Sequence, residues 1–241
     1  MRRRQRARYV LSYGAGVNST ALMIYLMKKK RRLDCVVFSD TGGEMPETYR
    51  YLSVADEYLT RHGVPFKTMR STNTSLFDTC VRREVVPSQV WRWCTRDYKV
   101  APIYRYYRSL GSHVYQYLGI AYDELERMKD SRADYVTNLY PLVDEKITRG
   151  DCEDMIVEEG LPIPVKSGCF FCPFNTMERW HQVYENHRVL YRRAMLLEES
   201  SKHFPKQRLA AHTLRGLGKS FRCRKIPQIE VYSPCGSECM T

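Results

Sequence analysis

The chain has 241 residues, 43% of them hydrophobic, which is enough to bury one substantial core. No apolar run is long enough to cross a membrane and no signal-peptide pattern is present, so we expect a cytoplasmic protein without a membrane partner. The formal net charge of +12 suits a polyanion such as DNA or RNA, although a solvated basic surface is the alternative. Nine cysteines, an odd number, indicate metal or redox chemistry rather than a disulfide framework.

A strand, a glycine-containing turn and a helix are expected near the N-terminus. They are predicted at residues 9–12, at 13–16 and from 18–20 onward. Gly14 and Gly16 allow a tight turn, and the free N–H groups and positive dipole of the helix start favour an anion. The polar side chains at the same mouth are Ser12, Asn18 and Ser19. The stretch therefore predicts a phosphate-binding loop, with an ordinary glycine-rich turn between a strand and a helix as the alternative. Its spacing is neither GxxxxGK[ST] nor GxGxxG.

Strands and helices alternate along the rest of the chain. Further strands are predicted at 35–38, 64–69, 114–120 and within 137–144. Helices are predicted at 46–62, at 104–109 and at 148–160, the last with a capping box of Thr148 and Asp151, while the polar stretch 71–90 is expected to be an irregular loop. This order predicts an α/β fold with a mainly parallel sheet flanked by helices.

Charged side chains follow two of the predicted strands. Asp40 lies just beyond the strand at 35–38, and ligands of open α/β sheets bind outside the carboxyl ends of strands. We therefore expect Asp40 and the first loop to face one crevice, with a turn or helix-entry role as the alternative. Glu124 and Arg127 follow the strand at 114–120 and stand at i and i+3, so they could also form only a surface pair.

The strongest chemical signal is the pair Cys169 and Cys172. Two thiolates three positions apart can bind one metal ion or two corners of an iron–sulfur cluster. Thiol–disulfide exchange and plain packing are the alternatives. Cys94 matters only if folding brings it to this pair, because a lone cysteine is usually packed in a core. Asn175 and Glu178 next predict a capping box for a helix whose spacing continues to residue 194.

Three segments resemble a known superfamily. SYGAGVNS at 12–19 resembles the SGGxDS loop of the PP-loop (N-type ATP pyrophosphatase) superfamily, with Asn18 where that family usually has Asp. FSDTGGEMPET at 38–48 and WRWCTRDYKVAPIYRYY at 91–107 resemble motifs of its phosphoadenosine phosphosulfate (PAPS) reductase branch. The resemblance implies an adenine nucleotide alpha hydrolase-like fold, ATP with Mg²⁺, and Asp40 and Glu44 near the ligand or metal. The nucleotide-binding residues that it implies are Ser12, Gly14, Ala15, Gly16, Asn18, Ser19, Thr20, Asp40, Glu124 and Arg127.

The same resemblance implies roles for the cysteines. Related reductases hold a [4Fe-4S] cluster through a tandem Cys-Cys and a later CxxC, and here Thr95 takes the second tandem position. The implied metal ligands are Cys94, Cys169 and Cys172, one short of four. Either one iron stays open, as in similar iron–sulfur tRNA thiolases, or a later cysteine among Cys223, Cys235 and Cys239 closes the site. Zinc is the alternative metal.

Three functional hypotheses follow. The first is a PP-loop enzyme that adenylates a substrate, releases pyrophosphate and supports iron–sulfur-dependent sulfur transfer to a nucleic acid. Its expected catalytic residues are Asp40, Lys99 and Cys235, and its expected partner is a sulfur donor such as a cysteine desulfurase, or a thioredoxin-like reductant. The second is a PAPS or adenosine phosphosulfate reductase that uses Cys235, and the third is a non-catalytic zinc-containing nucleic-acid-binding protein. We expect a nucleotide-binding domain at 1–165 and a helical, cysteine-bearing region at 166–241 packed on it.

Overall fold

The computed structural model describes residues 6–71 and 74–222, and it contains a five-stranded, wholly parallel sheet in the order β3-β2-β1-β4-β5. The strands are β1 (Arg8–Tyr13), β2 (Cys35–Ser39), β3 (Phe66–Met69), β4 (Val114–Leu118) and β5 (Val136–Leu139). Every residue of β2 is buried, as a strand covered on both faces requires. The parallel sheet confirms the predicted α/β fold class. No helix among the described residues is long and apolar enough to cross a membrane.

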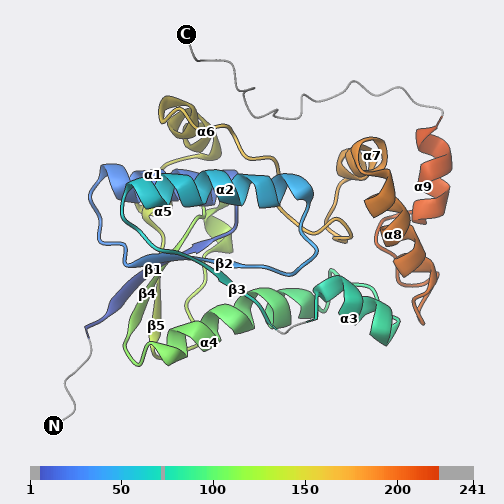
Figure 1. Ribbon diagram of the computed structural model, residues 1–241, viewed down its shortest axis with the longest axis horizontal. Coiled ribbons are helices and arrows are strands. Elements are labelled where there is room, and N and C mark those ends of the chain that lie inside the picture. The colour runs from blue at the N-terminus through green and yellow to red at the C-terminus, as the bar shows by residue number, and fades with distance from the viewer. Residues whose placement is uncertain (1–5, 72–73, 223–241) are drawn as a thin grey trace.

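Helices cover both faces of the sheet (Figure 1). One face carries α1 (Val17–Lys28), α2 (Pro46–Arg61), α5 (Pro141–Asp144) and α6 (Arg149–Glu158). The other carries α3 (Leu76–Arg83), a π-helical turn η1 (Thr95–Val100) and α4 (Ala101–Ser109). Alternate residues of β1 face the two layers, so Leu11 packs beneath α1 while Val10 packs toward α4. A 3₁₀ segment η2 (Tyr122–Arg127) follows β4.

The stretch 71–90 is not an irregular loop throughout, because it contains α3. The Ser75 hydroxyl accepts a hydrogen bond from the Asp78 N–H at 3.0 Å and caps this helix. Leu76, Phe77 and Cys80 share its buried face. The many polar residues around this short amphipathic pattern concealed it.

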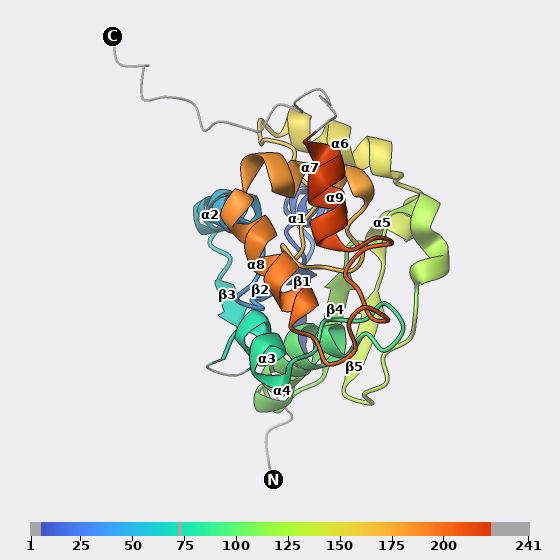
Figure 2. The same ribbon diagram turned by 90° about the vertical axis from the view of Figure 1, so that its right-hand side faces the viewer.

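Three helices close the described chain: α7 (Met177–Asn186), α8 (Arg188–Glu199) and α9 (Leu214–Phe221). They gather beyond the carboxyl ends of the strands, as Figures 1 and 2 show. The predicted capping box of Asn175 and Glu178 is wrong, because the Thr176 hydroxyl caps α7 by accepting from the Arg179 N–H at 3.3 Å. His187, with φ −138° and ψ 57°, separates α7 from α8 within the expected single helix.

The CxxC segment is joined to the sheet through the loop between β2 and α2. Glu44 and Cys169 form an isolated antiparallel bridge, and the Phe170 N–H donates to the Gly43 carbonyl at 3.0 Å. A Cβ atom on Gly43 would lie 2.7 Å from the Phe171 ring, so only glycine permits this contact. Residues more than 120 positions apart therefore meet at the carboxyl edge of the sheet.

Candidate functional site

A cleft of about 700 Å³ lies where β1 and β4 end and α1 begins. Its lining comes from the β1–α1 loop, the end of β4, η2, the start of α6 and the segment before the CxxC pair. The lining residues are Ser12, Gly14, Gly16, Val17, Asn18, Ser19, Leu118, Gly119, Ile120, Glu124, Arg127, Arg149, Lys166 and Ser167. This is the position outside the carboxyl ends of strands at which open α/β sheets bind ligands.

The loop at the bottom of the cleft directs backbone donors at one point. The N–H groups of Gly14 and Gly16 both donate to Ser19 Oγ, at 3.3 and 3.2 Å, and Ser19 Oγ donates to the Gly16 carbonyl at 3.0 Å. The left-handed turn residue is Ala15, with φ +54°, rather than either glycine. Backbone donors that converge on one oxygen at a helix start form an arrangement suited to a phosphate oxygen.

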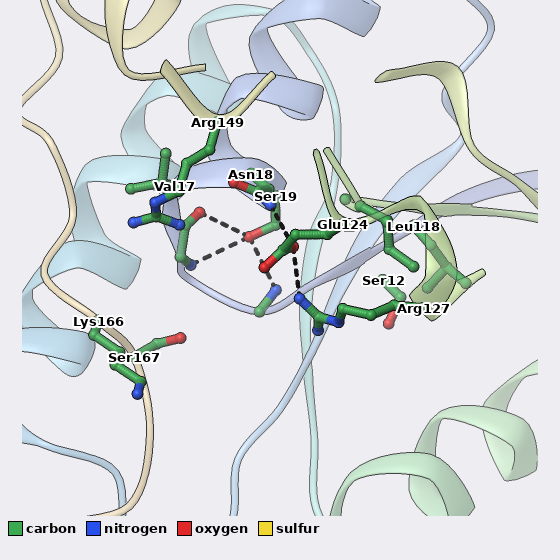
Figure 3. Close-up of a pocket in the computed structure, with 14 residues that line it drawn as sticks. Ser12, Val17, Asn18, Ser19, Leu118, Glu124, Arg127, Arg149, Lys166 and Ser167 are labelled. Carbon is green, nitrogen blue, oxygen red and sulfur yellow. Dashed lines mark hydrogen bonds and ion pairs between the residues drawn. The ribbon is translucent and has the colours of Figure 1, made fainter. Parts of the chain in front are cut away.

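Asn18, Glu124 and Arg127 form a linked group on the wall of the cleft (Figure 3). Asn18 Nδ2 donates to Glu124 Oε2 at 2.9 Å, and Arg127 Nη1 approaches the same oxygen at 2.6 Å. The i, i+3 pair of Glu124 and Arg127 is therefore present, but Glu124 also accepts from Asn18, which lies 106 positions earlier in the chain. Asn18 is 8% exposed, and its Oδ1 atom has no hydrogen-bond partner in the described structure. A buried carbonyl oxygen without a partner is costly unless a ligand or water satisfies it.

The cleft is lined by cations from three separate segments. Arg127 comes from η2, Arg149 from the first turn of α6, and Lys166 from the irregular segment before Cys169. Lys166 lies across the cleft from Arg127 in Figure 3. Only Arg127 was identified from the sequence. No local motif marks Arg149 or Lys166, because tertiary folding alone brings them to the loop.

Gly119 brings the end of β4 against the start of α1. A Cβ atom at this position would lie 2.7 Å from both the backbone N and Cα of Ser19 and 2.9 Å from the carbonyl carbon of Asn18. Backbone atoms cannot move aside as a flexible side chain can, so glycine is required here. Sequence inspection did not select Gly119, since a single glycine after a strand usually marks an ordinary turn.

Three of the predicted nucleotide-binding residues do not line the cleft: Ala15, Thr20 and Asp40. Ala15 is buried, at 1% exposed. Thr20 is fully buried and shares a hydrogen bond with the Tyr13 hydroxyl at 3.0 Å. Asp40 accepts from the Gly42 N–H and the Tyr49 hydroxyl, both at 2.8 Å, and from Arg70 through two bonds of 3.0 and 2.7 Å. Burial acts to raise the pKa of Asp40, but these partners together hold it below its usual range. Both Asp40 oxygens thus support the loop after β2.

The second concentration of chemistry is a thiol cluster, defined as Thr41, Glu44, Lys99, Cys169 and Cys172. Cys169 Sγ lies 3.2 Å from Thr41 Oγ1 and 3.7 Å from Glu44 Oε1. Lys99 Nζ lies 3.4 Å from the same carboxylate oxygen, whose charge raises the pKa of Lys99. Burial and then Glu44 raise the pKa of the Cys169 thiol, while Lys99 lowers it. Burial likewise raises the pKa of Cys172. Both thiols are therefore shifted toward the protonated form.

Cys94 lies in the same region but does not complete a metal site. It packs with Cys169 and Cys172 against one hydrophobic core. Burial is the largest cause of the raised pKa of Cys172, and the charge of a Cys94 thiolate would add to it. Among residues 6–71 and 74–222, however, no three His, Cys, Asp or Glu side chains are arranged to hold a metal ion. The described thiols thus do not by themselves fit a [4Fe-4S] cluster or zinc. Cys223, Cys235 and Cys239 lie outside the described residues.

The comparisons with known proteins address the family. The phosphoadenosine phosphosulfate reductase domain matches residues 8–149, more than half of the chain. Among solved structures, the PAPS reductase of Candida auris in a phosphate complex gives a TM-score of 0.47 at 15% identity, over 65% of this chain and 75% of that one. The U34-tRNA thiolase NcsA of Methanococcus maripaludis with its [4Fe-4S] cluster gives a TM-score of 0.43 at 11% identity, over 91% of this chain and 72% of that one. No curated protein matches the sequence. The chain belongs to the PAPS reductase domain family and is an enzyme of this PAPS reductase-like group.

Proposed function

We propose that the chain binds ATP in the cleft and adenylates a substrate, with sulfur transfer to a nucleic acid as the second half-reaction. The observation that carries the proposal is the meeting of the Gly14 and Gly16 N–H groups, the start of α1 and three cations at one cleft of about 700 Å³. Two backbone N–H donors together with three cations suit the several negative charges of a polyphosphate. The volume lies within the range of small-molecule sites.

Two oxygen-bearing side chains in the cleft fit Mg²⁺. Asn18 Oδ1 is buried without a partner, and Glu124 provides a carboxylate 2.9 Å from the amide nitrogen of Asn18. Carbonyl and carboxylate oxygens are the ligands that Mg²⁺ prefers, usually together with phosphate oxygens. We assign Asn18 and Glu124 to hold the metal, which when bound neutralises phosphate charge. Asp40, with its oxygens already engaged, supports the neighbouring loop.

In the adenylation step a substrate oxygen attacks the α-phosphorus of ATP. A bond forms between these atoms, the bond from the α-phosphorus to the bridging oxygen breaks, and pyrophosphate leaves. The N–H groups of Gly14 and Gly16 and the cations Arg127 and Lys166 are placed to stabilise the charge that develops on the phosphate oxygens. The two N–H groups donate to Ser19 Oγ in the described structure, so a phosphate oxygen takes the place of that hydroxyl when ATP binds.

The thiol cluster is adjacent in the chain to the cleft, since Lys166 and Ser167 line the cleft and Cys169 follows two residues later. We assign a persulfide on Cys169 or Cys172, loaded by a cysteine-desulfurase-type donor, as the sulfur nucleophile. It attacks the adenylated carbon, the carbon–oxygen bond breaks and AMP leaves. The second thiolate then forms a Cys169–Cys172 disulfide and releases the thiolated product, and a thioredoxin-like dithiol reduces the disulfide. Lys99 acts to lower the pKa of Cys169, against the larger raising effects of burial and Glu44.

The two half-reactions can be tested separately with ATP, a persulfide donor and unmodified RNA or DNA. We expect Cys169→Ala to release pyrophosphate at the wild-type rate and to form no thiolated nucleoside, as measured by mass spectrometry after nuclease digestion. Cys152→Ala is the matched control, because Cys152 is also a buried free cysteine but belongs to α6 and packs in the core with residues of α1. If no RNA or DNA elicits pyrophosphate release from the wild-type protein, the proposed function is wrong.

The family match itself favours reduction of PAPS as a second candidate function. In that reaction the Cys235 thiolate would attack the sulfur of the sulfonate, and the bond from that sulfur to the phosphate oxygen would break, so that adenosine 3′,5′-bisphosphate leaves. A second thiol would then form a disulfide with Cys235 and release sulfite. Sulfite production from PAPS by the wild-type protein, and its loss in Cys235→Ala, would establish the reductase. Thiolation that is unchanged in Cys235→Ala would favour the sulfurtransferase.

A further inference from the structure

Two adjacent side chains, Val90 and Trp91, are the most exposed of the large hydrophobic residues that the structure describes, at 86% and 81%. The Trp91 ring makes no ring–ring contact with any described residue, although Trp93, two positions later, packs edge-on against Tyr98 at 6.4 Å. Tryptophan is usually largely buried, so an isolated ring of this size in solvent indicates a surface that meets another molecule.

The turn that carries Trp91 is firmly held. Ser88 Oγ accepts from the N–H groups of Val90 and Trp91 at 3.2 and 3.4 Å, and the Arg92 N–H donates to the Ser88 carbonyl at 3.1 Å. Arg92 adopts a left-handed backbone, with φ +45°. A rigid turn reduces the conformational entropy that Trp91 would lose on binding a partner.

This turn lies against the segment that follows the CxxC pair. Gln89 Nε2 donates to the Pro173 carbonyl at 2.5 Å, and the Arg92 guanidinium stacks over the Phe174 ring at 5.2 Å. Pro173 and Phe174 come directly after Cys172. Trp91 is therefore presented beside the thiol cluster rather than at a distant part of the surface.

Three arginines lie close to Trp91 in the sequence. Arg82 and Arg83 end α3, and Arg92 follows Trp91. Within the described ranges none of these three has a carboxylate oxygen within 4.0 Å, whereas the nearby Arg96 is paired with Asp97. An exposed aromatic ring in a stretch with cations that have no carboxylate partner matches the composition of sites that bind single-stranded nucleic acid.

We propose that Trp91 is a stacking platform for an unpaired base of a single-stranded nucleic acid, with Arg92 and the end of α3 contacting its phosphates. The proposal rests on the proposed function and deepens it, because it names the surface that brings the acceptor to the thiol cluster. A second copy of this chain is a poor occupant, since each copy carries a formal net charge of +12 and the same arginines would face each other.

Fluorescence anisotropy of labelled oligo(rU) and oligo(dT), with a duplex of the same length as comparison, tests the proposal on the full chain. Trp91→Ala should weaken single-strand binding about five- to a hundredfold, while Trp91→Phe retains most of the affinity. Arg92→Gln should lower the slope of log K against log salt concentration by about one, which Trp91→Ala should not. The matched control is Val157→Ala, because Val157 is also exposed, at 59%, but lies on α6 across the sheet.

Equal affinity of Trp91→Ala and the wild type for both oligonucleotides would overturn the proposal. So would a wild-type dimer that Trp91→Ala dissociates in size-exclusion chromatography, because a second copy would then cover the ring. ATP binding, measured in parallel, separates this proposal from the proposed function. Intact ATP binding and pyrophosphate release with an unchanged Trp91→Ala affinity would reject the platform alone.

Discussion

Substitution of Gly119 by alanine should lower pyrophosphate release about a hundredfold, because a displacement of about 1 Å in a reacting group has an effect of this size. The added Cβ would meet backbone atoms of Ser19 at 2.7 Å, so β4 and α1 must separate. This separation moves the loop N–H groups away from Glu124 and Arg127, which follow β4. The free energy of unfolding should also fall, by about 1–3 kcal/mol. Steady-state pyrophosphate assays and urea unfolding measure the two effects.

Gly150→Ala is the control for this substitution. Gly150 lies in α6, next to Arg149 of the cleft, but its added Cβ would make only an ordinary contact, with Thr148 Oγ1 at 3.8 Å. Alanine in a helix should leave stability unchanged or raise it by up to about 1 kcal/mol. Wild-type turnover in Gly119→Ala would contradict the requirement for close approach.

Arg127→Ala should weaken ATP binding roughly tenfold to a hundredfold, the range for a hydrogen bond to a charged group. The variant loses a cation that lines the cleft. It also leaves the Glu124 carboxylate, now 2.6 Å from the guanidinium, without its neutralising partner beside the bound phosphates. Isothermal titration calorimetry with ATP and Mg²⁺ measures the loss.

Glu124 and Arg127 should not behave additively. With ATP in the absence of Mg²⁺, when Glu124 holds no metal, Glu124→Gln in the Arg127→Ala background removes the uncompensated charge and should recover part of the lost affinity, whereas independent residues would give additive losses. Arg188→Ala is the control, because Arg188 forms the same i, i+3 pair with Glu185 at 3.4 Å and has a side chain 56% exposed, against 59% for Arg127. An equal loss in Arg188→Ala would assign the effect to net charge rather than to the cleft.

Much of the fold was predictable because the sequence patterns that mark its strands, helix starts and turns extend over only a few residues. Strands such as β2 appear as apolar runs between turns. The Thr148–Asp151 capping box marks the start of α6: Thr148 Oγ1 accepts from the Asp151 N–H, and the Asp151 carboxylate accepts from the Thr148 N–H. The loop at 13–16 was also readable, since glycines before a helix start combine two local signals. These features depend on neighbours within a few residues.

The parts of the site that were missed depend on distant neighbours. Arg149 and Lys166 carry no local mark of a phosphate site, and the need for Gly119 exists only because α1 stands against the end of β4. Asp40 looked free in sequence, yet Arg70 and Tyr49 occupy its oxygens. The second core likewise mixes residues such as Met45 and Phe77 with the helices after residue 176, so a boundary at 165 stays a prediction.

The most direct test of the central claim is a crystal structure of the full chain with Mg²⁺ and α,β-methylene-ATP. Electron density for the phosphates should lie at the N–H groups of Gly14 and Gly16, between Arg127 and Lys166, with the metal next to Asn18 Oδ1. A nucleotide bound anywhere else on the chain, or a cleft that stays without nucleotide at saturating concentration, would contradict the account.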